Sequence, residues 1–164
     1  MINSLMVSAL NEQVNAELWS GYLYLSMSYD MDNKGFSGIA HWFAVQAREE
    51  FEHASRIAKY ITSRDAKVLL KPISEVRQEW NSPKDAFEDT LMHEKIVTGL
   101  IHNLMEKACE LKDYETKNML QWFINEQIEE EETPRQILHT LNMIGSNPAA
   151  LLILDKELKG REDD

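Results

Sequence analysis

The sequence predicts an all-α protein built as a four-helix bundle with a short fifth helix at its C-terminal end. Apolar residues recur at steps of three and four over four long stretches, and no stretch shows sustained alternation with a period of two. Glycine and proline are scarce, with 6 and 4 copies among 164 residues. A chain of this length can bury roughly 70% of its unfolded surface. We therefore expect one domain, residues 1–164, that folds without a disulfide or a structural metal.

Local signals divide the chain into five expected helices. Gly35 breaks the chain between the first two apolar stripes, and Gly145 ends the fourth. Ser82 and Pro83 supply an N-cap residue and a proline at the first helical position of the third stripe. Pro134 removes a backbone donor inside the fourth stripe and predicts a kink there. The expected helices cover about residues 5–33, 37–65, 83–112, 115–143 and 147–158.

The lengths of the connections predict the topology. The first two helices are joined by a few residues, as are the third and fourth, so each pair should form an antiparallel hairpin. About 16 residues, 66–81, separate the two hairpins. An extended segment of this length covers roughly the 42 Å of a ~28-residue helix. This crossover can therefore return along the bundle, which would make the second and third helices parallel.

Composition argues against several classes of partner and location. Seventeen basic residues against 28 acidic ones give a formal charge of −11, without any Lys/Arg cluster, so we expect neither nucleic acid nor a membrane surface as partner. No basic residue precedes Lys34, so no secretory leader is expected. The longest apolar run, 149–154, is too short to span a bilayer. The single cysteine, Cys109, suits a reducing compartment, and we expect a cytoplasmic protein.

Polar residues interrupt each of the four apolar stripes close to its midpoint. The interruptions lie within about four residues, or ~6 Å, of the estimated helix centres, so the bundle should bring them into one layer. They are Glu17 in the first helix, Glu50 and His53 in the second, Glu94 in the third, and Gln127 and Glu130 in the fourth.

Carboxylates buried in such a layer require a counter-charge. An unpaired ionised carboxylate in a low-dielectric interior costs several kcal/mol, and no lysine or arginine occupies the stripes. The acids are therefore either protonated or neutralised by cations, and the four glutamates would balance two divalent ions. Oxygen donors with one imidazole and no thiolate favour Fe(II) or Mn(II), although Zn(II) can also bind.

The spacing within the second and fourth helices refines this hypothesis. Glu50 and His53 lie one turn apart on one helix face, so they can share a metal ion. Gln127 and Glu130 repeat the spacing with an uncharged amide, which predicts a looser second site suited to an ion that changes oxidation state and leaves.

Simpler interpretations stay open for single features. A lone E-x-x-H commonly belongs to the surface, the acidic run 129–132 to a solvated face, and Tyr24 and Trp122 to packing.

The sequence contains the motifs Asn15-Ala16-Glu17-Leu18, Ala47-Arg48-Glu49-Glu50-Phe51-Glu52-His53 and Trp122-Phe123-Ile124-Asn125-Glu126-Gln127-Ile128-Glu129-Glu130. Together these three motifs resemble the ferritins, and most closely the bacterial non-haem ferritins. The resemblance covers nearly the whole chain, including the long crossover and the short fifth helix, and implies a ferritin-like bundle. Bacterioferritins usually repeat E-x-x-H in the fourth helix and carry a haem-binding methionine near position 52. Here position 52 is Glu52, so no haem is expected.

The resemblance implies a ferroxidase that oxidises Fe(II) with dioxygen or peroxide and passes Fe(III) to a mineral core. Tyr24 resembles a tyrosine beside the iron centre that can donate an electron. The resemblance implies Glu17, Glu50 and His53 as ligands of the first iron, with Glu50 bridging to the second. It implies Glu94 and Glu130 as ligands of the second iron, with Gln127 beside it to orient the oxidant. The implied ligands of a third iron are Glu49, Glu126, Glu129 and Glu130.

The apolar run 149–154 also predicts an assembly. A helix that is apolar on every face should be buried against neighbours. Four copies around a symmetry axis would bury it, which agrees with the 24-subunit octahedral shell of the family, and packing onto its own bundle is the alternative.

The leading hypothesis is an iron-storage ferroxidase in a homo-oligomeric shell. The alternatives are a di-metal redox enzyme acting on an organic substrate or on peroxide, and a metal-free structural bundle.

Overall fold

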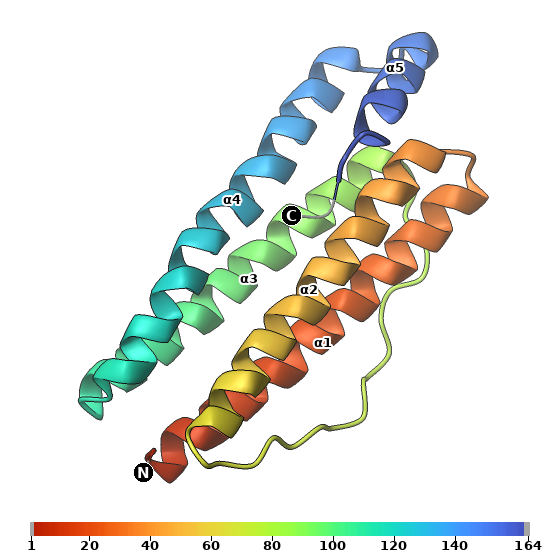
Figure 1. Ribbon diagram of the computed structural model, residues 1–164. Helices are drawn as coiled ribbons and strands as arrows, with labels where there is room; N and C mark the ends of the chain where they lie inside the picture. Colours follow the sequence, from red (N-terminus) through yellow and green to blue (C-terminus); the bar gives the residue numbers. More distant parts are fainter. Residues whose placement is uncertain (1, 163–164) are drawn as a thin grey trace.

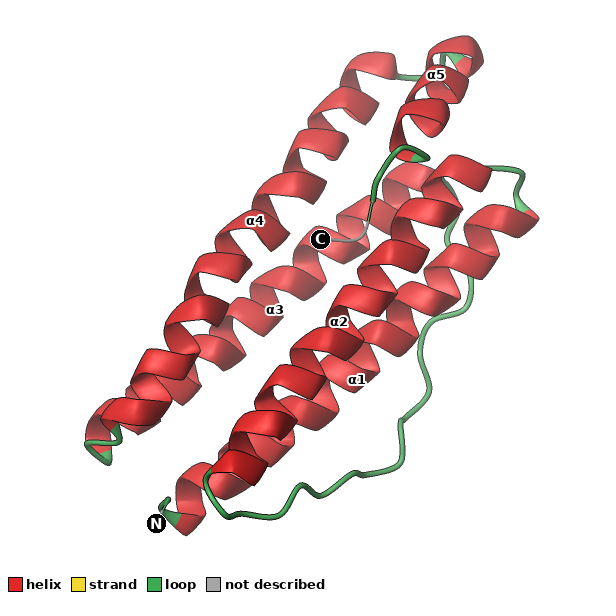
Figure 2. Cartoon of the chain, in the orientation of Figure 1, coloured by secondary structure: helices red, strands yellow, loops and turns green. Residues whose placement is uncertain are grey.

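Five helices make up all the regular structure of residues 2–162, the part of the chain that the computed structural model describes (Figures 1 and 2). The all-α fold class is thus confirmed, and each helix bound lies within two residues of the range expected from the sequence. No described helix combines the length and apolarity that a membrane span requires. The helices are α1 (Ser4–Asn33), α2 (Ser37–Ser63), α3 (Pro83–Glu110), α4 (Tyr114–Ile144) and α5 (Pro148–Leu158).

The four long helices form two antiparallel hairpins, α1 with α2 and α3 with α4 (Figure 1). The crossover, residues 64–82, runs from one end of the bundle to the other without helix or strand, so that α2 and α3 point the same way (Figures 1 and 2). This is the topology expected from the loop lengths. As a result, residues at the middle of all four helices lie at the same level of the bundle.

Two asparagines on α1 hold the crossover in its extended path. The Asn11 side chain donates to the carbonyl of Lys67 at 3.0 Å and accepts from the amide of Leu69 at 2.7 Å. Asn15, one turn later, donates to the carbonyl of Leu69 at 2.8 Å and accepts from the amide of Lys71 at 2.7 Å. These side chains satisfy backbone groups that have no strand partner, which keeps the connection ordered.

Side-chain caps begin the third and fourth helices where the sequence indicates. Ser82 Oγ accepts from the amide of Asp85 at 3.2 Å, and Asp113 Oδ1 accepts from the amide of Thr116 at 3.1 Å. Each bond satisfies one of the four amides that a helix start leaves without an internal partner. The helix α4 continues through Pro134 to Ile144, so the proline does not end it.

The core consists of two apolar clusters with a polar layer between them. In the cluster near α5, the rings of Phe43 and Phe87 stack with centroids 4.9 Å apart. Close packing within the two clusters holds the side chains of the polar layer between them in position. The first cluster includes Tyr24, Met27, Phe43, Trp80 and Phe87, and the second, toward the opposite end, includes Met6, Leu10, Ile57, Ile101 and Leu120.

The short helix α5 packs on the start of α2. The amide of Ile39 donates to Asp155 Oδ1 at 2.9 Å, and a Cβ atom at Gly38 would lie 1.6 Å from the carbonyl oxygen of Asp155. Only glycine permits this approach. The opposite side of α5 keeps Leu152 and Ile153 58% and 61% exposed. The helix therefore packs partly on its own bundle and leaves an apolar face uncovered in the single chain.

Candidate metal centre

Four helices bring five acidic or imidazole side chains into the layer between the two apolar clusters. Each of them is at most 7% exposed. We call these five residues the buried centre: Glu17 from α1, Glu50 and His53 from α2, Glu94 from α3 and Glu130 from α4.

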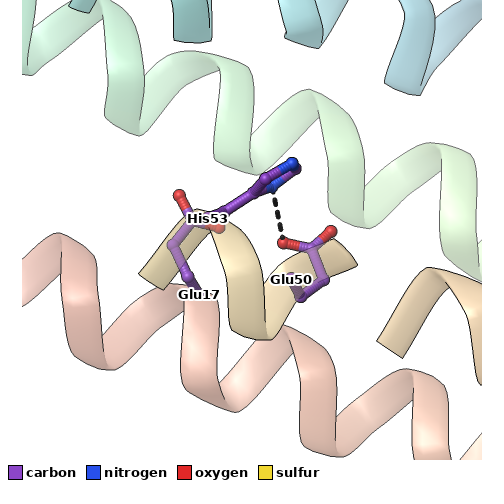
Figure 3. A group of neighbouring side chains, drawn as sticks. All are labelled: Glu17, Glu50 and His53. Atoms are coloured by element: carbon purple, nitrogen blue, oxygen red, sulfur yellow. Dashed lines mark ion pairs between the residues drawn. The ribbon is translucent and has the colours of Figure 1, made fainter. Parts of the chain in front are cut away.

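Two groups of possible ligands lie side by side in the buried centre. Ligand atoms of Glu17, Glu50 and His53 all lie within 4.8 Å of one another (Figure 3). The same limit holds for Glu50, Glu94 and Glu130. Because Glu50 belongs to both groups, its carboxylate occupies the position from which two ions could be bridged.

Burial makes negative charge costly at these carboxyl groups. Desolvation raises the pKa of Glu50 and Glu130 well above the usual value, and the charges of neighbouring acids raise it further. Burial also raises the pKa of Glu17, and it raises that of Glu94 to about 7. Without cations the centre therefore holds protons near neutral pH, and a divalent ion that binds there displaces them.

His53 is neutral in this environment. Burial first, and then the charge of Arg56, lower its pKa to about 4. Its Nδ1 atom lies 3.3 Å from Oε2 of Glu50 (Figure 3), but a neutral imidazole does not compensate the carboxylate charge. The rings of Trp122 and Phe123 meet it edge-on at 5.4 and 6.0 Å. A neutral imidazole held in a fixed orientation is a suitable metal ligand.

Two glutamines that were not assigned to the site from the sequence bind its carboxylates. Gln13 Nε2 donates to Glu17 Oε1 at 2.8 Å. Gln46 Nε2 donates to Glu130 Oε2 at 2.7 Å and to Glu50 Oε1 at 3.4 Å. Gln13 and Gln46 each precede a glutamate of the centre by one helical turn, and this spacing was the available signal.

These amides satisfy only part of the centre. Oε2 of Glu17 and Oε2 of Glu50 are buried and form no hydrogen bond. Apart from the contact between Glu17 and Glu50 themselves, the described side chains that bind or approach the four carboxylates are amides, a phenol and an imidazole, and none of these carries positive charge. Buried acceptors without donors are rare in folded proteins. The donor set therefore fits divalent cations that prefer oxygen ligands together with one imidazole.

Gln127 lies in the layer as a hydrogen-bond donor. Its Nε2 atom is 3.3 Å from Oε2 and 3.3 Å from the carbonyl oxygen of Glu94, and 3.2 Å from Thr98 Oγ1. The Thr98 hydroxyl in turn donates to Glu131 at 2.7 Å. This network orients the Gln127 amide toward the second ligand group.

Tyr24 belongs to the site and not only to the core. Its hydroxyl donates to Oε1 of Glu94, and burial followed by the charge of Glu94 raises its pKa well above 10, so the phenol stays protonated. The ring stacks on Phe43 at 6.3 Å and meets His93 at 5.9 Å. His93, to which the sequence assigned no role, is held by Ser20 Oγ at 2.8 Å.

The acidic residues expected to form a third site are more dispersed. We call Glu49, Glu126 and Glu129 the acidic rim, because all three line a cleft of about 760 Å³ beside His53. Glu126 Oε1 lies 3.9 Å from His53 Nε2, and Glu126, His53 and Glu130 form a third convergent group. Glu49 forms an ion pair with Arg161, and Glu129 is exposed.

An all-α bundle whose four long helices each bring a carboxylate into one buried layer is the arrangement of ferritin-like proteins. Residues 7–144 match the family model of the ferritin-like domain, and the chain belongs to this family. The resemblance inferred from the sequence motifs is therefore confirmed.

Proteins named as ferritins match this chain over nearly its whole length. A bacterial non-heme ferritin of Bacteroides fragilis is 38% identical over 161 residues, 98% of this chain and 100% of the relative. A probable bacterial non-heme ferritin-like protein of Haemophilus influenzae is 37% identical over 96% of each chain. The crystal structure of an open pore ferritin from the archaeon Archaeoglobus fulgidus has a TM-score of 0.98 at 44% identity, covering 99% of this chain and 100% of that one.

Proposed function

We propose that this chain stores iron as a ferroxidase, which oxidises Fe(II) to Fe(III) and deposits a ferric mineral inside a protein shell. The observation that carries the proposal is the buried centre, where four carboxylates and a neutral imidazole form two ligand groups that share Glu50. Membership of the ferritin-like family and the ferritin names of its relatives support iron storage.

Each ligand group would receive one Fe(II) ion as substrate. Glu17, Glu50 and His53 would hold the first, and Glu94 and Glu130 would hold the second, with Glu50 between them. Four carboxylates balance the charge of two divalent ions, and so relieve the electrostatic cost of burial. Bound iron would also take up the carboxylate oxygens of Glu17 and Glu50 that form no hydrogen bond.

Two neighbouring Fe(II) ions supply the electrons for a two-electron reduction. Each ion loses one electron, and the pair, with two protons, reduces dioxygen to hydrogen peroxide or hydrogen peroxide to two water molecules. Protons that iron displaces from the carboxyl groups of the buried centre are available for this step. Gln127 would orient the oxidant beside the second ion, and Tyr24, bonded to Glu94, would be placed to donate an electron.

The acidic rim would serve a third iron, together with Glu130. His53, Glu126 and Glu130 already converge, while Glu49 and Glu129 line the same cleft. Because this cleft is open, ions held there are more exposed than those in the buried centre. We assign this third site to the transit of Fe(III) away from the centre.

The proposal includes a homo-oligomeric shell of 24 chains that contains no haem and lies in the cytoplasm. The exposed Leu152 and Ile153 on α5 would be buried by neighbouring subunits. The ferritin structures that match this chain and the non-heme names of its relatives support this assembly and a haem-free centre.

Stopped-flow absorbance tests the proposed reaction. Two Fe(II) ions per chain are added anaerobically, and the protein is then mixed with dioxygen or with hydrogen peroxide. We expect Fe(III) absorbance to rise at least tenfold faster than in protein-free buffer, because bound pairs react within the protein. A rise at the buffer rate with both oxidants would contradict the proposal.

The mass of the assembly separates storage from the alternative of a di-metal enzyme that acts on an organic substrate. In size-exclusion chromatography, a shell of 24 chains of 19.0 kDa should elute at about 460 kDa. Elution as a monomer or dimer would favour the enzyme alternative.

A further inference from the structure

The residues after α5 place a positive charge beside the buried centre. Arg161 Nη2 lies 2.5 Å from Oε2 of Glu49, and the two side chains are only 20% and 14% exposed. The two residues are 112 positions apart in the sequence. An ion pair with this little exposure is less screened by solvent than most surface pairs.

Three further contacts fix the position of Arg161 on α2. Its guanidinium carbon lies 4.3 Å from the ring centroid of Trp42, at a distance typical of a cation–π interaction. Its Nη1 atom donates to the carbonyl of Trp42 at 3.4 Å, and its own carbonyl oxygen lies 2.8 Å from His41 Nε2. The guanidinium is therefore held by Trp42 as well as by Glu49.

The carboxylate that Arg161 binds belongs to the acidic rim. Glu49 lines the same cleft as Glu126, Glu129 and His53. A cation that enters this cleft thus meets one acidic side chain already bound to a guanidinium.

We propose that Arg161 is a built-in cation of the acidic rim, which holds Glu49 and competes there with a third metal ion. The inference rests on the proposed function for the identity of the third site. Arg161 repels a divalent cation and withholds one carboxylate from it, so the third ion binds weakly and leaves readily. The two ligand groups that share Glu50 do not include Glu49 and keep their affinity.

Calorimetric titration of the metal-free, full-length assembly with Zn²⁺ alone tests this role without any oxidation step. In the unmodified protein we expect two tight sites per chain and a weaker third. Arg161→Ala should tighten the third site about tenfold, since it removes a nearby like charge and the ion pair that competes for the Glu49 carboxylate. It should leave the two tight sites unchanged.

Three variants separate this role from simple anchoring of the C-terminal segment. Arg161→Lys keeps the charge and should leave the third site weak. Lys159→Ala removes the same charge from an exposed position two residues earlier and should behave as the unmodified protein. Glu49→Gln combined with Arg161→Ala should lose the tenfold gain, because the gain requires the negative charge of the Glu49 carboxylate.

The outcomes distinguish this inference from the proposed function. Absence of the two tight sites in the unmodified protein would contradict the proposed function itself. If those sites are present and Arg161→Ala changes the third site by less than twofold, the role of Arg161 is overturned. A gain of the same size in Lys159→Ala or in the double variant would also overturn it.

Discussion

The buried centre and the acidic rim contain similar side chains but balance their charge in different ways. In the buried centre, the amides and the phenol that donate hydrogen bonds to Glu17, Glu94 and Glu130 carry no positive charge, and burial raises the pKa values of all four glutamates. In the acidic rim, Glu129 faces solvent and Glu49 is paired with an arginine of the same chain. An acidic cluster is thus strong evidence for a cation site only where neither water nor a basic side chain compensates it.

The largest expected effect comes from removing the carboxylate that both ligand groups share. Glu50→Ala should slow the first rapid phase of Fe(II) oxidation by about 100-fold or more, since both ions lose a ligand. The fold should stay intact, because Glu50 belongs to neither of the two apolar clusters that form the core. Stopped-flow absorbance measures the rate, and circular dichroism checks the fold.

Glu52→Ala is the matched control for this experiment. Glu52 lies two residues further along α2 and is exposed. It should oxidise Fe(II) within about twofold of the unmodified rate. Unchanged kinetics in Glu50→Ala would refute the ligand assignment.

The next largest effect concerns the stability of the metal-free protein as a function of pH. The pKa values of Glu50 and Glu130 are higher in the folded state than the value near 4.5 of the unfolded chain. The protonated carboxyl groups therefore add their full contribution to the free energy of unfolding below pH 4.5, and this contribution is lost as pH rises toward the folded-state pKa. Between pH 6.5 and 8 the free energy of unfolding should fall by up to about 1.4 kcal/mol per pH unit for each carboxyl group that remains protonated.

Most of an opposing contribution from two histidines lies below this pH window. Burial lowers the pKa of His53 and His93 to about 4 in the folded protein. The stability that these neutral side chains contribute is lost as pH falls below 6.5, the pKa of histidine in the unfolded chain. Urea unfolding at pH 6.5 and 8, at one protein concentration, measures the change. Glu50→Gln should flatten the dependence, and a stability that rises over this window would contradict the raised pKa values.

A smaller effect is expected from the acidic rim, and it should appear later in the reaction. Glu126→Gln with Glu129→Gln should leave the first two-iron oxidation within about twofold and slow the following turnovers roughly fivefold. Repeated additions of Fe(II), followed by absorbance and oxygen consumption, separate the phases. Equal damage to both phases would remove the distinction between the buried centre and the acidic rim.

The smallest effect is expected at Tyr24. Tyr24→Phe keeps the ring stacked on Phe43 but removes the hydroxyl that donates to Glu94. Because this hydroxyl contacts a ligand and not the ions, the first oxidation should slow by only about threefold. A loss as large as that of Glu50→Ala would place Tyr24 among the ligands instead, and the same stopped-flow assay decides between these results.

Helical periodicity made the buried centre predictable from the sequence. Glu17, Glu50, Glu94 and Glu130 each interrupt an apolar stripe near its middle, and helices of similar length place such positions at one level. The helix bounds followed from local signals such as the Ser82 cap.

Contacts between distant segments could not be predicted in this way. The pairing of Glu49 with Arg161 depends on how α5 packs against Gly38, and no local pattern encodes this approach. The hydrogen bond from Gln46 to Glu130 joins residues on α2 and α4, so it requires the rotation of each helix. The fifth helix was expected to be buried against neighbouring subunits, and in the single chain one side of α5 meets its own bundle while Leu152 on the other side is exposed.

Anomalous diffraction from crystals soaked anaerobically in ferrous salt tests the central claim most directly. The account predicts two iron peaks per chain inside the four-helix layer, one bound by Glu17, Glu50 and His53, and the other by Glu50, Glu94 and Glu130. Iron found only at exposed acidic side chains, or no peak between these residues, would contradict it.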